Sequence, residues 1–241
     1  MTITEAGAKT PGSELNGDRV PRLQAGDRLT VEEFERRYAA MPDLKKAELI
    51  NGVVYMPSPV LHEEHGSPHF DVIGWLAYYR AMTAGVDGGD NSTLRLQVGA
   101  NRPQPDAFLR ILPSFGGRST TVDGYVVGGP ELIAEISASS ASYDLHDKLN
   151  IYQKNQVLEY VVWRVWDKAV DWFVLRSEHY ESLPADPVGI YRSQVFPGLW
   201  LDGAAMLRRD LAQVLRTLQL GLASPEHASF VAQLQARVAR A

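Results

Sequence analysis

Residues 105–109 read Pro-Asp-Ala-Phe-Leu and residues 132–137 read Leu-Ile-Ala-Glu-Ile-Ser, and these two apolar runs decide the expected fold. Each run has the composition of a buried strand, yet each carries one acid, Asp106 or Glu135. A buried carboxylate is costly unless it is paired or binds a metal ion. Two acids on neighbouring strands cannot neutralise each other, so the pattern predicts a cation between them.

A base follows these two runs. Lys148 begins a helical pattern, with Asp144 four residues before it and Tyr152 four residues after it. Residues at this spacing share one side of a helix, and Lys148 borders the apolar stripe of that helix. We expect its amine to reach back toward the two acids across the end of the sheet.

A hairpin is predicted before the two runs, with strands at 47–50 and 53–56. Asn51 and Gly52 join the strands, and this pair suits a type I′ turn, which needs positive φ at both central positions. Glu48 lies in the first strand and is a third acid in an apolar context. Thr30 fits the start of a capping box and predicts a helix that Pro42 ends.

The remaining periodicity predicts more helices and strands in alternation. Helices are expected at 70–82, after Lys148, at 204–220 and at 225–239, and strands at 94–98, 159–163 and 169–175, with weaker strands near 180–183, 191–196 and 199–201. This order predicts an α/β (α+β) fold, a mixed β-sheet flanked by helices with a C-terminal helical extension.

Three parts are expected along the chain. Residues 1–27 read as a disordered tail, 28–207 as one domain and 208–241 as C-terminal helices. The helix at 225–239 has an apolar stripe that the core does not need. We therefore predict that it helps to form a homodimer.

Composition excludes several classes of site. The 241 residues contain no cysteine, which rules out disulfides, thiolate zinc sites and cysteine nucleophiles. No stretch resembles a signal peptide or reaches the length of a membrane span, so a cytoplasmic protein without membrane association is expected. The net charge of −5 counts against a nucleic-acid coat protein but not against an enzyme with a small site on a phosphodiester, because a metal ion supplies positive charge locally.

Two carboxylates with a lysine beside them suit phosphodiester hydrolysis. Mg²⁺, or another divalent ion such as Mn²⁺, prefers hard oxygen ligands and would bind between Asp106 and Glu135. A bound ion lowers the pKa of a water molecule. Lys148 would orient that water or stabilise the charge that develops on the phosphate.

Pro105-Asp106, the Glu135-Ile136-Ser137 strand and Lys148 resemble the PD-(D/E)XK nuclease superfamily, and more narrowly the Uma-two family of restriction endonucleases. The similarity runs over about residues 28–207. It implies a restriction-endonuclease-like fold that cleaves DNA with a divalent ion. It also implies that Asp106 and Glu135 are catalytic and bind the metal, that Lys148 is the catalytic lysine, and that Glu48 completes the catalytic site.

The chain departs from these patterns at two positions. The superfamily expects a lysine two residues after the second acid, where this chain has Ser137, and the Uma-two pattern uses a lysine on the next helix, which Lys148 supplies. That family usually has glycine where Gln156 stands, so Gln156 is expected to cost some stability if the position needs positive φ.

Three of the four site residues also have a simpler explanation, whereas Glu135 in its apolar run favours a functional role. Asp106 can be satisfied by main-chain amides, Lys148 can be a solvated helix lysine, and Glu48 can pair with Lys45 or Lys46 at the surface. The spacing of His62, His65 and His69 superficially suggests zinc but is irregular for one helix face. A contact from His65 to a substrate phosphate is more plausible than zinc, and the absence of any functional role is an equal alternative. Six basic residues are candidates for contacts with DNA phosphates or for a solvated rim: Lys45, Lys46, Arg95, Arg102, Arg110 and Arg118.

Two other classes of function remain open. A non-catalytic module would keep the nuclease scaffold for binding or assembly, and the acidic net charge favours it. A hydrolase that uses paired acids without a metal, for instance on glycosides, is the third reading. Sensitivity to magnesium and to EDTA separates these from the nuclease.

Overall fold

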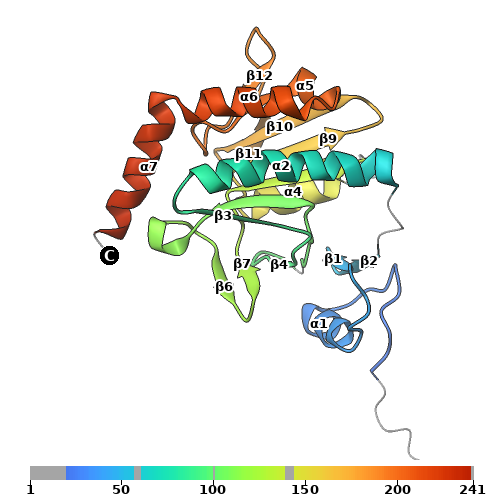
Figure 1. Cartoon of the computed structure of the whole chain (residues 1–241). Coiled ribbons are helices and arrows are strands. Elements are labelled where there is room, and N and C mark those ends of the chain that lie inside the picture. Colours follow the sequence, from blue (N-terminus) through green and yellow to red (C-terminus); the bar gives the residue numbers. More distant parts are fainter. Residues whose placement is uncertain (1–19, 57–60, 100, 139–143, 240–241) are drawn as a thin grey trace, which may run out of the picture.

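A six-stranded mixed sheet forms the centre of the molecule (Figure 1). The structure is a computed structural model that describes residues 20–56, 61–99, 101–138 and 144–239. The strand order is β11-β10-β9-β8-β5-β3; β8 and β9 are parallel, and the other neighbours are antiparallel. The strands are β3 (Val86–Asp90), β5 (Ala107–Ile111), β8 (Leu132–Ser137), β9 (Glu159–Arg164), β10 (Ala169–Arg176) and β11 (His179–Ser182).

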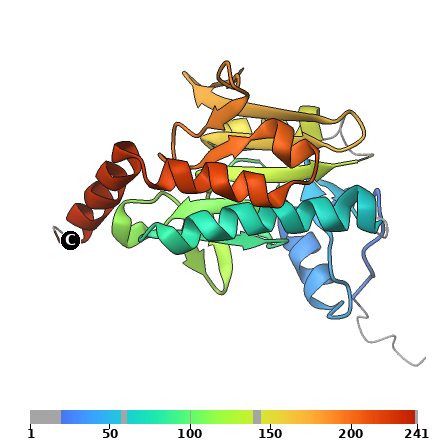
Figure 2. The same cartoon turned by 45° about the horizontal axis from the view of Figure 1, so that its top comes forward.

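Helices cover one face of this sheet. Figure 2 shows α2 (Ser67–Met82) and α6 (Leu211–Leu222) side by side across it, and the short α5 (Gly203–Leu207) packs against α6 and β10. Leu109 and Leu132 point into the core between the sheet and these helices. A two-stranded sheet, β12 (Ile190–Arg192) and β13 (Trp200–Asp202), packs against α6.

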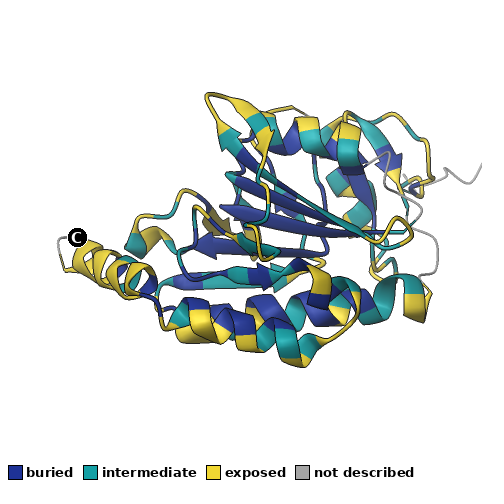
Figure 3. Cartoon of the chain, turned by 90° about the horizontal axis from the view of Figure 1, so that it is seen from above, coloured by how far each residue is buried: buried dark blue, intermediate teal, exposed yellow. Residues whose placement is uncertain are grey.

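The second face carries the other half of the core. Phe108 and Ile133, the sequence neighbours of Leu109 and Leu132, pack there because successive side chains of a strand point to opposite faces. The cover consists of α4 (Leu149–Lys154), which follows the single π-helical turn η3 (Asp144–Lys148), and of the small sheet β4 (Leu94–Arg95), β7 (Tyr125–Val127) and β6 (Thr120–Val122). Because both faces are covered, the inner strands are buried throughout (Figure 3).

The N-terminal part forms a smaller cluster beside the end of the sheet. It contains α1 (Val31–Ala39) and the hairpin β1 (Glu48–Ile50) and β2 (Val53–Tyr55). Thr30 caps α1 by accepting a hydrogen bond from the N–H of Glu33 at 3.3 Å, as predicted. The φ angles of Asn51 (51°) and Gly52 (77°) confirm the type I′ turn.

The boundary of the predicted tail is wrong. Leu23 is buried in the cluster of α1 and the hairpin, and the N–H of Gly26 donates to the carbonyl of Val54 at 2.8 Å. Residues 20–27 are therefore ordered by apolar contact and strand-like hydrogen bonds, while residues 1–19 lie outside the described part of the chain.

Other elements also differ from the prediction. The strand β3 was not expected, because its sequence Val-Asp-Gly-Gly-Asp has little strand propensity. The predicted helix at 204–220 is two helices, because Arg209 takes a φ of 64° and Asp210 caps α6. Residues 62–66 form the single π-helical turn η1 (His62–Gly66), and α2 begins directly after it at Ser67.

Gln156 has a φ of 58°. The position therefore has the left-handed conformation in which glycine is favoured. This is the condition under which a glutamine is expected to cost stability, and the cost itself stays a prediction.

The last helix, α7 (Pro225–Val238), uses part of its apolar stripe inside the chain. Leu234 is buried, and Phe230 packs against the same core cluster as α2 and α6. The premise that the core does not need this stripe is wrong, and the homodimer stays a prediction. No helix in the described part of the chain is both long and apolar enough to cross a membrane.

Candidate active site

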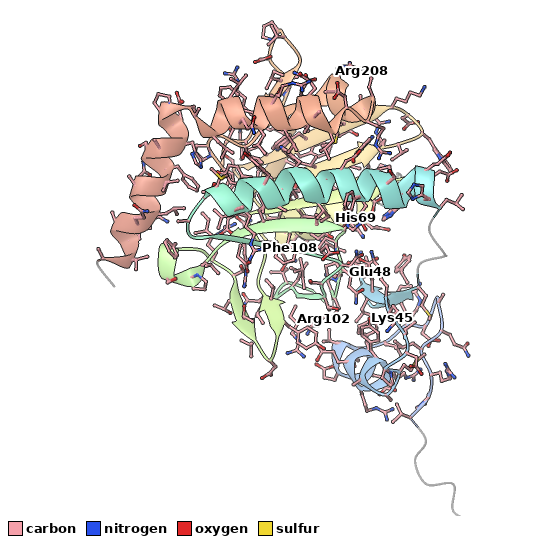
Figure 4. The ribbon with its side chains drawn as sticks, viewed as in Figure 1. Lys45, Glu48, His69, Arg102, Phe108 and Arg208 are labelled. Atoms are coloured by element: carbon pink, nitrogen blue, oxygen red, sulfur yellow. The ribbon has the colours of Figure 1, made fainter. Side chains whose placement is uncertain are left out.

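The predicted acids and the lysine lie together at one end of the central sheet. Figure 4 shows Glu48 of β1 and His69 of α2 close to this end, between the hairpin and the first turns of α2. Asp106 comes from the residue before β5, Glu135 from β8 and Lys148 from the last position of η3. Elements distant in the sequence thus supply one cluster of charges.

The strand register places the two acids beside each other. Ala107 pairs with Ala134 in the antiparallel β5–β8 ladder, so one further step brings Asp106 opposite Glu135. The N–H of Asp106 lies 3.3 Å from Oε2 of Glu135, and the N–H of Ile136 donates to Oδ2 of Asp106 at 2.9 Å. The carboxylates therefore lie on the same side of the sheet, both almost fully buried.

Lys148 binds the deeper end of this cluster. Its Nζ lies 2.9 Å from Oε1 of Glu135, 3.2 Å from Oε1 of Glu48 and 3.7 Å from Oδ1 of Asp144. The hydroxyl of Tyr152 donates to the same oxygen of Glu135 at 2.9 Å. The spacing of Asp144, Lys148 and Tyr152 in the sequence thus brings all three residues to the acids.

Two basic side chains reach Asp106 from the more exposed side. Lys46 Nζ lies 3.3 Å from Oδ1, and His65 Nε2 lies 3.2 Å from Oδ2. His69 Nε2 lies 2.8 Å from the main-chain carbonyl of Asp106. Helix α2 and the turn before it therefore hold the start of β5 in place.

Burial and charge shift the two acids in opposite directions. Burial alone raises the pKa of Asp106, but the hydrogen bond from His65 and the charges of Lys46 and His65 outweigh it, and the pKa falls below its usual value. Burial raises the pKa of Glu135 to about 8, against the opposing charge of Lys148. Burial also acts to lower the pKa of Lys148, yet the surrounding carboxylates raise it well above its usual value. Lys148 is therefore charged, and its charge opposes the loss of ionisation that burial favours at Glu135.

The cluster has an excess of acids, which bears on whether it suits a divalent ion. Four carboxyl groups, those of Glu48, Asp106, Glu135 and Asp144, face the two lysines at 46 and 148. Within residues 20–56, 61–99, 101–138 and 144–239, no group of three or more His, Asp or Glu side chains is arranged to hold an ion by itself. Mg²⁺ fits such a site nonetheless, because one or two carboxylates suffice when water and a substrate phosphate complete its shell.

Several alternatives from the sequence are wrong. Glu48 does not pair with Lys45 or Lys46 at the surface, because it is buried, accepts a hydrogen bond from the N–H of Gln104 at 2.7 Å and contacts Lys148. Asp106 has a main-chain amide partner, as its simpler explanation required, but it also has two basic ones. Lys148 is not a solvated helix lysine, since its side chain is 5% exposed.

Most of the basic candidates already have partners inside the chain. Arg110 is buried and binds Asp87 at 3.0 Å, so it is not available to a phosphate. Arg95 and Arg102 both pair with Glu35. The contacts of Lys46 and Tyr152 with the acids were not predicted from the sequence. The four-residue spacing between Lys148 and Tyr152 indicates that Tyr152 lies near the acids, whereas no local pattern indicates the contact of Lys46.

Two comparisons place the chain among known proteins. A sequence model of the Uma2 family, described as “Putative restriction endonuclease”, matches residues 31–204. A crystal structure from Anabaena variabilis ATCC 29413, described as “a putative nuclease belonging to DUF820”, is similar with a TM-score of 0.56 and 13% sequence identity, over 74% of this chain and 99% of that chain. At this identity the likeness shows the fold, and it agrees with the predicted restriction-endonuclease-like architecture. No curated protein matches the chain.

Proposed function

The chain belongs to the Uma2 family of restriction-endonuclease-like proteins, and from this premise we propose that it is a divalent-metal-dependent endonuclease that hydrolyses phosphodiester bonds in DNA. The observation that carries the proposal is the meeting of Asp106 and Glu135 beside Lys148 in a buried site with an excess of carboxyl groups. Paired carboxylates at the end of a sheet supply the oxygen ligands that a hard divalent ion prefers.

Each residue of the site has a proposed role. Asp106 and Glu135 would hold the ion. When bound, such an ion polarises the substrate phosphate and lowers the pKa of a water molecule. Lys148 keeps the carboxylates of Glu48 and Glu135 in position and adds positive charge next to the reacting phosphate. Glu48 in turn fixes Lys148 and the main chain of Gln104, two residues before Asp106. His65 would contact a substrate phosphate from the turn before α2.

The test replaces each proposed ligand by its amide. Asp106→Asn and Glu135→Gln should each abolish Mn²⁺ binding measured by calorimetry and slow Mg²⁺-dependent cleavage of DNA by at least about a hundredfold. The matched control is Asp123→Asn, which removes an exposed carboxylate from the turn between β6 and β7. Cleavage at the wild-type rate by both amide variants, in protein free of contaminating nuclease, would reject the proposal.

The rival function is a non-catalytic module that keeps the nuclease scaffold for binding or assembly. The net charge of −5 and the pairing of Arg95 and Arg102 with Glu35 favour it, because few cations are left for a broad nucleic-acid surface. The same assays decide between the nuclease and the module. A non-catalytic module would bind its partner but cleave no DNA, whether or not EDTA is present. Hydrolysis of a glycoside that persists in EDTA would point instead to paired acids that work without metal.

A further inference from the structure

We propose that Lys46 is a displaceable counter-ion of the active site, which neutralises Asp106 while no metal is bound and contacts a DNA phosphate once a divalent ion has taken its place. The proposal rests on the function proposed above. It assigns to Lys46 a role that neither the family nor the sequence pattern specifies.

The contacts of the two acids differ in how easily they can be broken. Oδ2 of Asp106 is held by the main-chain N–H of Ile136, which belongs to a central strand. Oε1 of Glu135 is held by Lys148 and Tyr152, both buried. An ion cannot replace these groups without disturbing the core.

Lys46 is a different kind of partner. Its Nζ lies 3.3 Å from Oδ1 of Asp106 and 3.2 Å from the amide oxygen of Asn91, and its side chain is 22% exposed. Lysine has a flexible four-carbon stem and a compact, well-hydrated charge, so it can leave a carboxylate and move into water at small cost. An ion that approaches Oδ1 from solvent therefore meets Lys46 first and has to displace it.

The displaced ammonium group would stay near the reaction. Lys46 lies two residues before Glu48, at the entry to β1, so the position of its main chain is set by the hairpin. A phosphate bound to an ion at Asp106 would lie within reach of the same side chain. Lysine binds phosphate as a point charge without strict geometry, which suits a group that changes partners.

The first measurement is Mn²⁺ binding without DNA. Lys46→Met should lower the Kd by about fivefold, because an ion pair of this exposure is worth up to about 1 kcal/mol and no longer competes with the ion. Lys45→Met is the matched control. Lys45 is the neighbouring residue and its side chain is exposed, so this variant loses the same charge outside the site, and its Kd for Mn²⁺ should equal that of the wild type. If Lys46→Met does not fold, Lys46→Gln is used in its place.

The second measurement is the affinity for a DNA duplex as a function of salt, on samples in which the duplex remains intact. With Mn²⁺, the slope of log K against log salt should become smaller by about 0.9 in Lys46→Met, which corresponds to one lost phosphate contact. In EDTA the slope should match that of the wild type, because Lys46 is then held by Asp106.

The results distinguish this proposal from the function on which it rests. If the wild type binds Mn²⁺ and cleaves DNA but Lys46→Met binds the ion no more tightly than Lys45→Met, the role of Lys46 is overturned and the nuclease stands. If Mn²⁺ affinity rises but the salt slope does not change, the phosphate contact is overturned. A wild type that binds no Mn²⁺ defeats both proposals.

Discussion

Lys148 carries the charge balance of the buried site. Its Nζ contacts Glu135 at 2.9 Å and Glu48 at 3.2 Å, and Asp144 lies at 3.7 Å. Removing one partner from a buried ion cluster leaves the other charges without compensation, which costs more than the intact cluster contributes. The residue is therefore expected to affect folding as well as the proposed chemistry.

We predict that Lys148→Met lowers the free energy of unfolding by about 3–5 kcal/mol. Glu48→Gln in the Lys148→Met background should recover part of this loss, because one uncompensated carboxylate is removed. Urea denaturation of the single and double variants measures both effects. A Lys148→Met protein as stable as the wild type would contradict the charge balance described here.

Glu159 gives a pH dependence outside the active site. Burial raises its pKa from 4.5 to about 7, although hydrogen bonds from the hydroxyl of Ser193 and from the N–H groups of Gln194 and Val195 oppose this shift. Between these two pH values the unfolded chain loses the proton of Glu159 while the folded chain keeps it. Stability due to this group is therefore full below pH 4.5 and falls as the pH rises to about 7.

The variant Glu159→Gln should remove this fall, which is on the order of 3 kcal/mol at most. The measurement is the free energy of unfolding by urea at acidic and at mildly alkaline pH for both proteins. The difference between the two pH values should be smaller in the variant. An equal difference would mean that Glu159 is ionised in the folded protein over the whole range.

The elements differ in how far local sequence explains them. The hairpin follows from Asn51-Gly52 and helix α1 from its cap at Thr30, because these signals act through neighbouring residues. Strand β3 follows from tertiary contact instead. Its two glycines lie against Phe108 of β5, where a side chain would not fit, and pairing with β5 supplies the hydrogen bonds of the strand.

We predict opposite effects for two glycine-to-alanine changes. A Cβ at Gly88 in β3 would lie 2.6 Å from the carbonyl oxygen of Phe108, so Gly88→Ala should destabilise the protein by about 1–3 kcal/mol. A Cβ at Gly74 in α2 would lie 3.6 Å from Cδ2 of Leu211, an ordinary contact, so Gly74→Ala should stabilise it by up to about 1 kcal/mol. Thermal unfolding of both variants checks the signs, and a shift in the same direction for both would refute the account of β3.

The C-terminal helix ties the end of the chain to its middle. Leu234 is buried, Phe230 packs edge-on against Phe196, and His227 Nε2 lies 2.9 Å from the hydroxyl of Thr83 at the end of α2. These contacts belong to the same core as the central sheet, so α7 contributes to the folding of a unit that extends beyond the matched residues 31–204.

Deletion of the residues after Ser224 should therefore destabilise the protein by on the order of 3 kcal/mol or more, because it exposes core side chains. The change is measured by thermal unfolding. Light scattering on the full chain and on the truncated chain tests the predicted homodimer separately. A dimeric full chain and a monomeric truncated chain would support the homodimer. The same number of chains per particle in both proteins would show that α7 is not needed for an interface.

The residues of the candidate site could be predicted from the sequence where a charged residue stands in an apolar run. Asp106, Glu135 and Glu48 are acids in apolar runs, and Lys148 borders an apolar helical stripe, so burial and the need for compensation follow from local pattern. Their partners do not follow from it. Lys46 lies 60 residues from Asp106, and Gln104 lies 56 residues from Glu48.

Local sequence is enough for turns, caps and strand alternation, since these depend on the dihedral preferences and side-chain spacing of adjacent residues. The pairing of β5 with β8, the strand at β3 and the contact of Lys46 with Asp106 depend on chain segments that meet only in the folded molecule. The excess of negative charge that suggests a divalent ion arises from these tertiary contacts. It is a property of the four carboxyl groups together, and no single segment of the chain contains it.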